Sequence, residues 1–207
     1  DITGGILTMG MNGPAVADSG NVVINNRGVL VTRGTFSAGL LAQSVAGGGG
    51  ATNSQGNEEF FMGSLHGQRS QAGSVTITNS GNIQTEGQGS IALLAQRIGG
   101  GGGYTASLGF AENGISAERM FLSAYYTDSA SAGDITVTNT AESISTFGTA
   151  SPAILVQSIG GGGGWSFVEG VRSAGGRLGK KGGSDGAGGS ISITNNADLI
   201  TYGDDSH

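Results

Sequence analysis

The chain has 207 residues with a formal net charge of −6; 43 residues are glycine, two are proline and none is cysteine. Without cysteine it has no disulfide, thiol nucleophile or cysteine-bound metal. With only nine lysines and arginines it offers no basic surface for nucleic acid, so we expect no nucleic-acid partner. Its valines, isoleucines, leucines and phenylalanines are just numerous enough for a core, which we expect to be thin and elongated.

After a polar lead-in, similar units begin at Gly20, Gly73, Gly133 and Gly189, at intervals of 53, 60 and 56 residues. Each unit opens with a stretch in which valine or isoleucine alternates with another residue and which ends in asparagine, as in Val75–Asn79. Alternation with period two predicts a strand whose apolar side chains share one face. Asparagine favours a bend after that strand.

The first three units then carry an apolar run that contains a glutamine and leads into four or five glycines. The runs are Leu40–Val45, Leu93–Ile98 and Ile154–Ile159. Short strands separated by bends cannot bury their apolar faces alone, but they can when each unit stacks on its neighbours. The pattern therefore predicts an all-β parallel β-helix (β-solenoid) with three-strand rungs of about 20–25 residues and two to three rungs in each unit.

Variable segments at 51–72, 104–132 and 165–188 follow the glycine runs, and we interpret them as inserts on a constant scaffold. Within them we expect further strands at Glu59–Met62, Tyr104–Phe110, Arg119–Leu122 and Trp165–Val168. Their bulky side chains either plug the core or bind a partner, because aromatic residues are enriched at interfaces. The candidates for partner binding are Phe60, Phe61, Tyr125, Tyr126, Trp165, Arg172, Arg177, Lys180 and Lys181.

No motif supports a catalytic, cofactor-binding or metal-binding residue, and we expect no cofactor. The glycine runs fit close-packed corners better than a phosphate cradle, since any glycine motif matches several glycines in a row. The segment 182–186 matches the G-x-S-x-G pattern of hydrolases, but the chain's histidines are only His66 and His207, and the motif lies in a glycine-rich insert. We expect the carboxylates to lie on solvated faces.

The segments Ser37–Gly50, Ser90–Gly103 and Ser151–Gly164 resemble the repeats of large autotransporters, the type V secreted surface proteins of Gram-negative bacteria. The resemblance covers nearly the whole chain except the inserts. The second repeat departs from it, with Arg97 where serine is usual, and the third has Pro152 and an alanine in place of a glycine. The resemblance implies a right-handed β-helix that is exported, displayed through a C-terminal outer-membrane β-barrel, and active in adhesion, aggregation or biofilm formation.

The leading prediction is a non-catalytic segment, residues 1–207, forming a single β-solenoid within a longer adhesin at the cell surface or outer membrane. We expect this monomeric segment to act as a rigid stalk or to bind a protein or glycan on a host or neighbouring cell. The alternative is a secreted β-helix enzyme that acts on polysaccharide. Acids gathered with a basic residue on one face would favour the enzyme, and scattered acids would favour the adhesin or a passive spacer.

Overall fold

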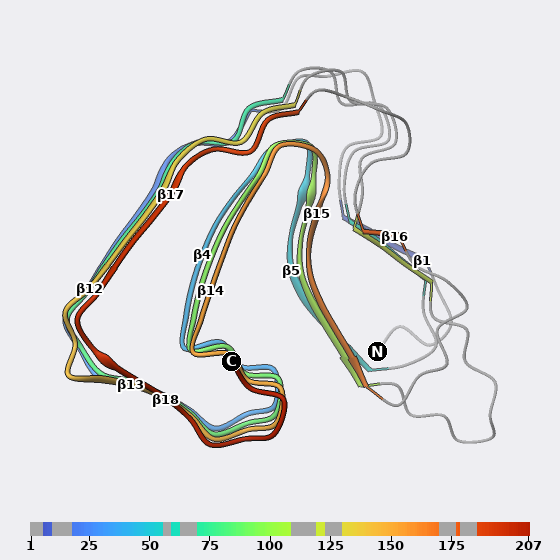
Figure 1. Ribbon diagram of the computed structural model, residues 1–207. Helices are drawn as coiled ribbons and strands as arrows, with labels where there is room; N and C mark the ends of the chain where they lie inside the picture. The colour runs from blue at the N-terminus through green and yellow to red at the C-terminus, as the bar shows by residue number, and fades with distance from the viewer. Residues whose placement is uncertain are drawn as a thin grey trace, which may run out of the picture.

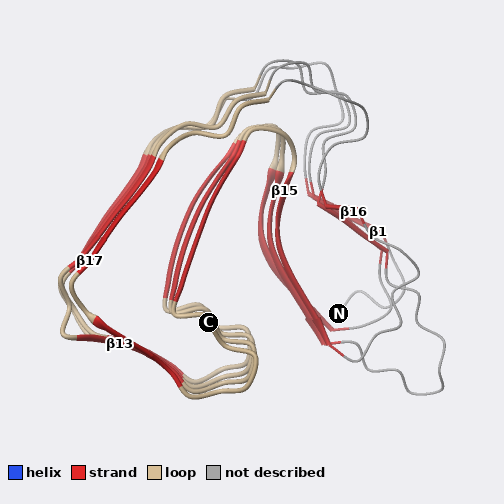
Figure 2. Cartoon of the chain, in the orientation of Figure 1, coloured by secondary structure: helices blue, strands red, loops and turns tan. Residues whose placement is uncertain are grey.

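The computed structural model describes residues 6–9, 18–55, 59–62, 70–108, 119–122, 130–169, 177–178 and 186–207. In these ranges every regular element is a β-strand, and the strands form five sheets in which all pairs are parallel (Figures 1 and 2). The described residues include no helix long and apolar enough to cross a membrane. The predicted all-β class with parallel strands is confirmed.

Each sheet contains the same strand from successive units. The first sheet holds β2 (Val22–Asn26), β7 (Val75–Asn79), β12 (Ile135–Asn139) and β17 (Ile191–Asn195). The second holds β3 (Leu30–Thr32), β8 (Ile83–Thr85), β13 (Ser143–Thr146) and β18 (Asp198–Thr201). The third holds the apolar runs, β4 (Leu40–Val45), β9 (Leu93–Ile98) and β14 (Ile154–Ile159).

Two further sheets follow the glycine runs. One holds β5 (Gly49–Gln55), β10 (Gly102–Leu108) and β15 (Gly163–Glu169). The other holds β1 (Ile6–Met9), β6 (Glu59–Met62), β11 (Arg119–Leu122) and β16 (Arg177–Leu178). The prediction that the inserts supply strands is therefore confirmed.

One unit makes one layer of the stack, and we number layers 1 to 4 from Gly20, Gly73, Gly133 and Gly189. Val22 of β2 pairs with Val75 of β7, a whole unit later, and consecutive strands of one unit lie in different sheets. The prediction of three-strand rungs of about 20–25 residues is wrong, because layers 1 to 3 each contribute five strands within the described residues alone. Figure 1 looks along the stack, so equivalent strands of the layers overlap.

The alternating stretches of layers 2 and 3 bury one face, as predicted, whereas Ile191 and Ile193 of β17, in the last layer, are exposed. Val75 and Ile77 of β7 and Ile135 and Val137 of β12 are fully buried, while the residues between them point outward. These side chains form one apolar cluster with residues of the second and third sheets. The hydrophobic effect therefore holds the first three sheets around a common core.

The third sheet is covered on both faces, which explains why the apolar runs do not alternate. Leu93 and Ala95 of β9 point into the core shared with β7, whereas Leu94 points into a second cluster with Phe36 and Tyr104. In Figure 1 this sheet lies between the sheet of β12 and β17 and the sheet of β5 and β15. Strands covered on both faces read as continuous apolar runs. A small three-strand coil has one interior only, so it could not have covered both faces.

The glycine runs bring the backbones of neighbouring layers close together. Gly102 adopts a φ of +130°, which side chains rarely tolerate, and a Cβ there would collide with the carbonyl oxygen of Gly163. Gly102 is also paired in register with Gly49 of the layer before it. The interpretation of these runs as close-packed corners without room for a side chain is confirmed.

Candidate functional site

Polar side chains run through the stack in hydrogen-bonded columns, whose inner members are buried and whose end members are half-buried. In the asparagine column, each Nδ2 donates to Oδ1 of the next layer at 2.7 Å. Its members are Asn26, Asn79, Asn139 and Asn195. The side-chain amides of Gln43, Gln96 and Gln157 form a second column, with bonds of 2.6 and 2.7 Å. These columns satisfy amides that would be costly to bury unpaired.

One polar column is interrupted at its middle layer. Ser44, Arg97 and Ser158 occupy equivalent positions in β4, β9 and β14. The Ser44 hydroxyl donates to the carbonyl of Gly20 at 2.9 Å, the first glycine of its own unit. Ser158 likewise donates to the carbonyl of its unit glycine at 3.0 Å.

The Ser158 hydroxyl also accepts a hydrogen bond, from the N–H of Gly189 in the next layer at 2.8 Å. Arg97 cannot copy this contact, because a guanidinium has donors and no acceptor. Gly133, the counterpart of Gly189 one layer earlier, therefore lacks the serine acceptor at this position. The substitution changes the chemistry of the column as well as its size.

The Arg97 side chain lies between layers 2 and 3, where the other layers bring backbone against backbone. A Cβ built on Gly73 would collide with the backbone of Gly20, and one on Gly189 with the backbone of Gly133. A Cβ on Gly133 would instead collide with the guanidinium of Arg97. The guanidinium thus occupies space that is filled by backbone elsewhere in the stack.

Backbone hydrogen bonds beside the guanidinium are correspondingly long. Between layers 2 and 3, the bond from Val75 N to Asp134 O measures 3.3 Å and that from Ala72 N to Ser131 O measures 3.4 Å. The equivalent bonds measure 2.8 and 3.0 Å between layers 1 and 2, and 2.9 and 3.0 Å between layers 3 and 4. Arg97 therefore acts as a wedge that separates two layers locally.

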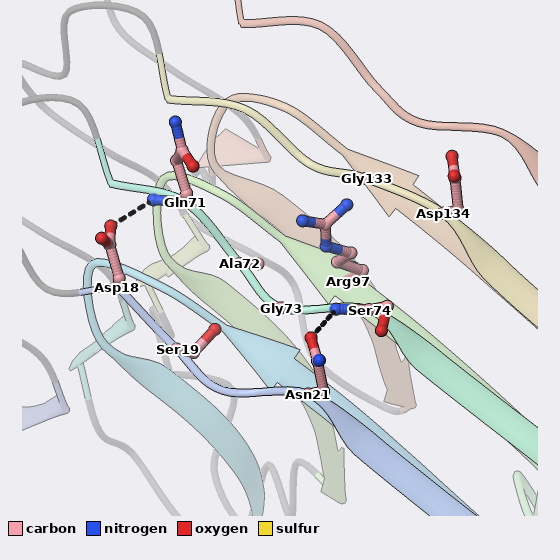
Figure 3. Close-up of a pocket in the computed structure, with 10 residues that line it drawn as sticks. All are labelled: Asp18, Ser19, Asn21, Gln71, Ala72, Gly73, Ser74, Arg97, Gly133 and Asp134. Carbon is pink, nitrogen blue, oxygen red and sulfur yellow. Dashed lines mark hydrogen bonds between the residues drawn. The ribbon is translucent and has the colours of Figure 1, made fainter.

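The wedge lies beside an open hollow of about 510 Å³, which we call the Arg97 hollow (Figure 3). The lining residues come from three successive layers and the lead-in of the first. They are Asp18, Ser19, Asn21, Gln71, Ala72, Gly73, Ser74, Arg97, Gly133 and Asp134. Figure 3 shows Asp18 beside Gln71 at one side of the hollow, and Arg97 on the side of Asp134, which directly precedes β12.

Within the described residues, some polar groups of the hollow are hydrogen-bonded and others are not. Oδ1 of Asp18 accepts the N–H of Gln71 at 2.8 Å, and Oδ1 of Asp134 accepts the N–H of Ser190 at 3.0 Å. Both carboxylates are exposed, and these bonds use only one of the two oxygens of each. The half-buried Arg97 has a buried Nε that finds no partner among the described residues. Burial lowers the pKa of Arg97, and the negative charge of Asp134 partly opposes this.

The residues predicted for partner binding do not gather at this hollow. Trp165 of β15 packs against the cluster that contains Phe36 and Tyr104, so it is at least partly a core residue. Phe60 and Phe61 lie in β6 and Arg177 lies in β16, where the structure describes backbone only. Tyr125, Tyr126, Arg172, Lys180 and Lys181 lie outside the described residues. From the sequence, Arg97 was noted as a departure from the repeat but was not predicted to be a functional residue. The signal that could have identified it is an arginine at a position where the neighbouring units have serine.

No group of three or more histidine, aspartate or glutamate side chains that could hold a metal ion occurs in the described part of the chain. Comparisons with protein-family models, with curated proteins and with solved structures found no match.

Proposed function

We propose that this chain is a non-catalytic segment of a surface-displayed autotransporter adhesin and that its layers are coils of a right-handed parallel β-helix. The observation that carries the proposal is the register. Val22, Val75, Ile135 and Ile191 pair in one row, so the chain advances by one layer in each unit. Crossover connections between parallel strands are right-handed in nearly all proteins, which supports the proposed hand.

A stack of this kind suits export. Each layer pairs with the layer before and the layer after it, so folding can proceed layer by layer as the chain emerges. The buried amides of Asn79, Gln96 and Asn139 are used in contacts between layers. These contacts build a rigid rod, which is the property that a stalk requires.

In this proposal the stack presents the variable segments to a protein or glycan on a host or neighbouring cell. The intervals between equivalent asparagines are 53, 60 and 56 residues, yet the strands stay in register. Most of the variation falls after the glycine runs, so the recognition surface can change while the scaffold is kept.

The test is protease shaving of intact cells that produce the full-length protein, with an antibody against this segment. We expect the segment to be attached to cells and lost on shaving, while an internal marker survives. Shaved cells should also lose the adhesion or aggregation of untreated cells. A segment that stays protected inside the cell would contradict display, and an intact segment in the medium would favour a secreted enzyme.

A secreted β-helix enzyme acting on polysaccharide is the second candidate, and one observation favours it. Asp18, Asp134 and Arg97 lie on one face, as acidic and basic groups would in a polysaccharide cleft. Incubation of the purified chain with acidic and neutral polysaccharides should then release new reducing ends, and Asp134→Asn should abolish that release. If the wild-type chain releases none, the enzyme candidate is rejected.

A further inference from the structure

We propose that the Arg97 hollow binds a small monocarboxylate that carries hydrogen-bond donors next to its carboxylate, with the carboxylate on the guanidinium of Arg97. The donors of such a ligand are hydroxyls in a sugar acid and an ammonium in an amino acid. The proposal goes beyond surface display and does not depend on it, because it concerns groups within this chain alone.

The need for an acceptor follows from the broken serine column. Ser158 accepts the N–H of Gly189 at 2.8 Å, but Arg97 brings only donors to the equivalent place beside Gly133. Its Nε is buried without a partner among the residues that the structure describes. Nε itself has almost no accessible surface, so a ligand in the hollow would meet the terminal N–H groups of the guanidinium, since Arg97 lines the hollow. A carboxylate can take two parallel N–H bonds from one guanidinium.

The limit to one negative charge follows from the two aspartates. Asp18 and Asp134 both line the hollow, and each uses Oδ1 to accept a backbone N–H of a later layer. Their second oxygens are acceptors for donors on the ligand. Like charges repel at short range. A dianion would therefore be attracted more strongly to Arg97 but would also be repelled more strongly by both aspartates.

The dimensions of the hollow agree with a small ligand. Its volume of about 510 Å³ lies within the range of roughly 300–1,000 Å³ that is usual for small-molecule sites. The hollow is lined by polar groups from separate layers, namely Asn21, Gln71 and Ser74 as well as the charged residues. A ligand placed here would bridge layers that the Arg97 wedge holds apart.

The binding test is an NMR titration of the purified chain with D-glucuronate and, separately, with L-alanine. We expect saturable shifts of the Arg97 Nε–H and of the backbone N–H groups of Gly73 and Gly133 with at least one of the two. The ligand that binds identifies the donors as hydroxyls or as an ammonium. Glucose, which lacks the carboxylate, and inorganic sulfate, a dianion, should bind at least about tenfold more weakly, the effect of one charged hydrogen bond.

Three variants locate the effect. Arg97→Ser restores the residue found in the neighbouring layers and should abolish binding while keeping the fold. Gly133→Ala should also weaken binding, because the nearest atoms to its new Cβ all belong to the movable guanidinium. Arg33→Ser is the matched control, since it removes the same charge from an exposed pair with Glu86.

The proposal is overturned if neither carboxylate binds, if sulfate binds as well as the carboxylates, or if Arg97→Ser binds as well as the wild-type chain. Circular dichroism of each variant confirms that a loss of binding is not a loss of fold. Gly133→Ala provides a second reading should Arg97→Ser alter the stack.

Discussion

Gln43 and Gln96 lie 53 residues apart in the chain, yet Nε2 of Gln43 donates to Oε1 of Gln96 at 2.6 Å. Gln96 in turn donates to Gln157 at 2.7 Å, and its side chain is completely buried. The middle glutamine is therefore bonded on both sides by identical groups. The side-chain amides therefore help to fix the strand register of the third sheet, in addition to the backbone hydrogen bonds.

Replacing Gln96 by alanine should lower the free energy of unfolding by about 2 kcal/mol. The substitution removes the partner of Nε2 of Gln43 and of Oε1 of Gln157, two half-buried side chains, and each lost hydrogen bond is worth about 1 kcal/mol. Urea denaturation measures the change. Gln84→Ala is the control, because Gln84 bonds only Glu86 on the outer surface and should change stability little.

Ile77→Asp should prevent stable folding. Ile77 is fully buried in the first core, and an unpaired carboxylate there would cost more than about 4 kcal/mol. Thr76→Asp, one residue earlier and facing outward, should leave the strand signal in circular dichroism unchanged. Equal melting temperatures for the two variants would contradict the inward placement of Ile77.

Arg97→Ser should raise the free energy of unfolding by about 1 kcal/mol, the usual net value of one hydrogen bond. The serine hydroxyl can donate to its unit glycine, as Ser44 does to Gly20, and the buried unpaired Nε disappears. Thermal and urea denaturation without ligand test this. A variant less stable than wild type would mean that the wedge contributes more to packing than it costs.

The stability of the chain should fall above pH 10 because of Tyr104. Burial raises the pKa of this phenol to about 12 from about 10 in the unfolded chain. Its contribution is complete below pH 10, decreases as the pH rises, and is lost above pH 12, an effect of up to about 3 kcal/mol.

Tyr104→Phe should remove this pH dependence, at the cost of the weak bond to the Gly89 carbonyl at 3.3 Å. Unfolding free energies of both proteins, measured in urea from pH 8 to pH 12, give the comparison. If both curves fall equally, the dependence belongs to other groups.

Gly102→Ala should destabilise the sheet of β5, β10 and β15. The new Cβ would collide with the Gly163 carbonyl, and φ at this position is +130°. Both effects together should cost at least about 2 kcal/mol. Gly28→Ala is the control, since its Cβ would meet only Oδ1 of Asn26, at 3.9 Å. Melting temperatures of the two variants should differ clearly.

The local features of the fold could be predicted from sequence because they depend on neighbours in the chain. Alternation in Val75–Asn79 specifies which side chains turn inward, and the glycine runs mark corners without Cβ atoms. The repeated asparagines also indicate the strand register. Asn26, Asn79 and Asn139 occupy the same position in successive units, and their identical amides bond to one another.

The size of a layer could not be predicted in the same way. Leu93 and Leu94 looked like one buried strand, and no local pattern states that two separate cores use them. The wedge was equally hidden. Arg97 is visible in the sequence as a departure, but the separation it causes depends on distances between layers, such as the 3.3 Å bond from Val75 to Asp134.

The one-unit, one-layer register has a consequence for how such a chain changes over generations. A duplicated stretch from one unit glycine to the next would find, above and below, the same asparagine and glutamine partners as its parent. Unequal recombination between near-identical gene segments can therefore add or remove a layer without disturbing the rest. Each event would change the length of the rod by one strand spacing, about 4.8 Å.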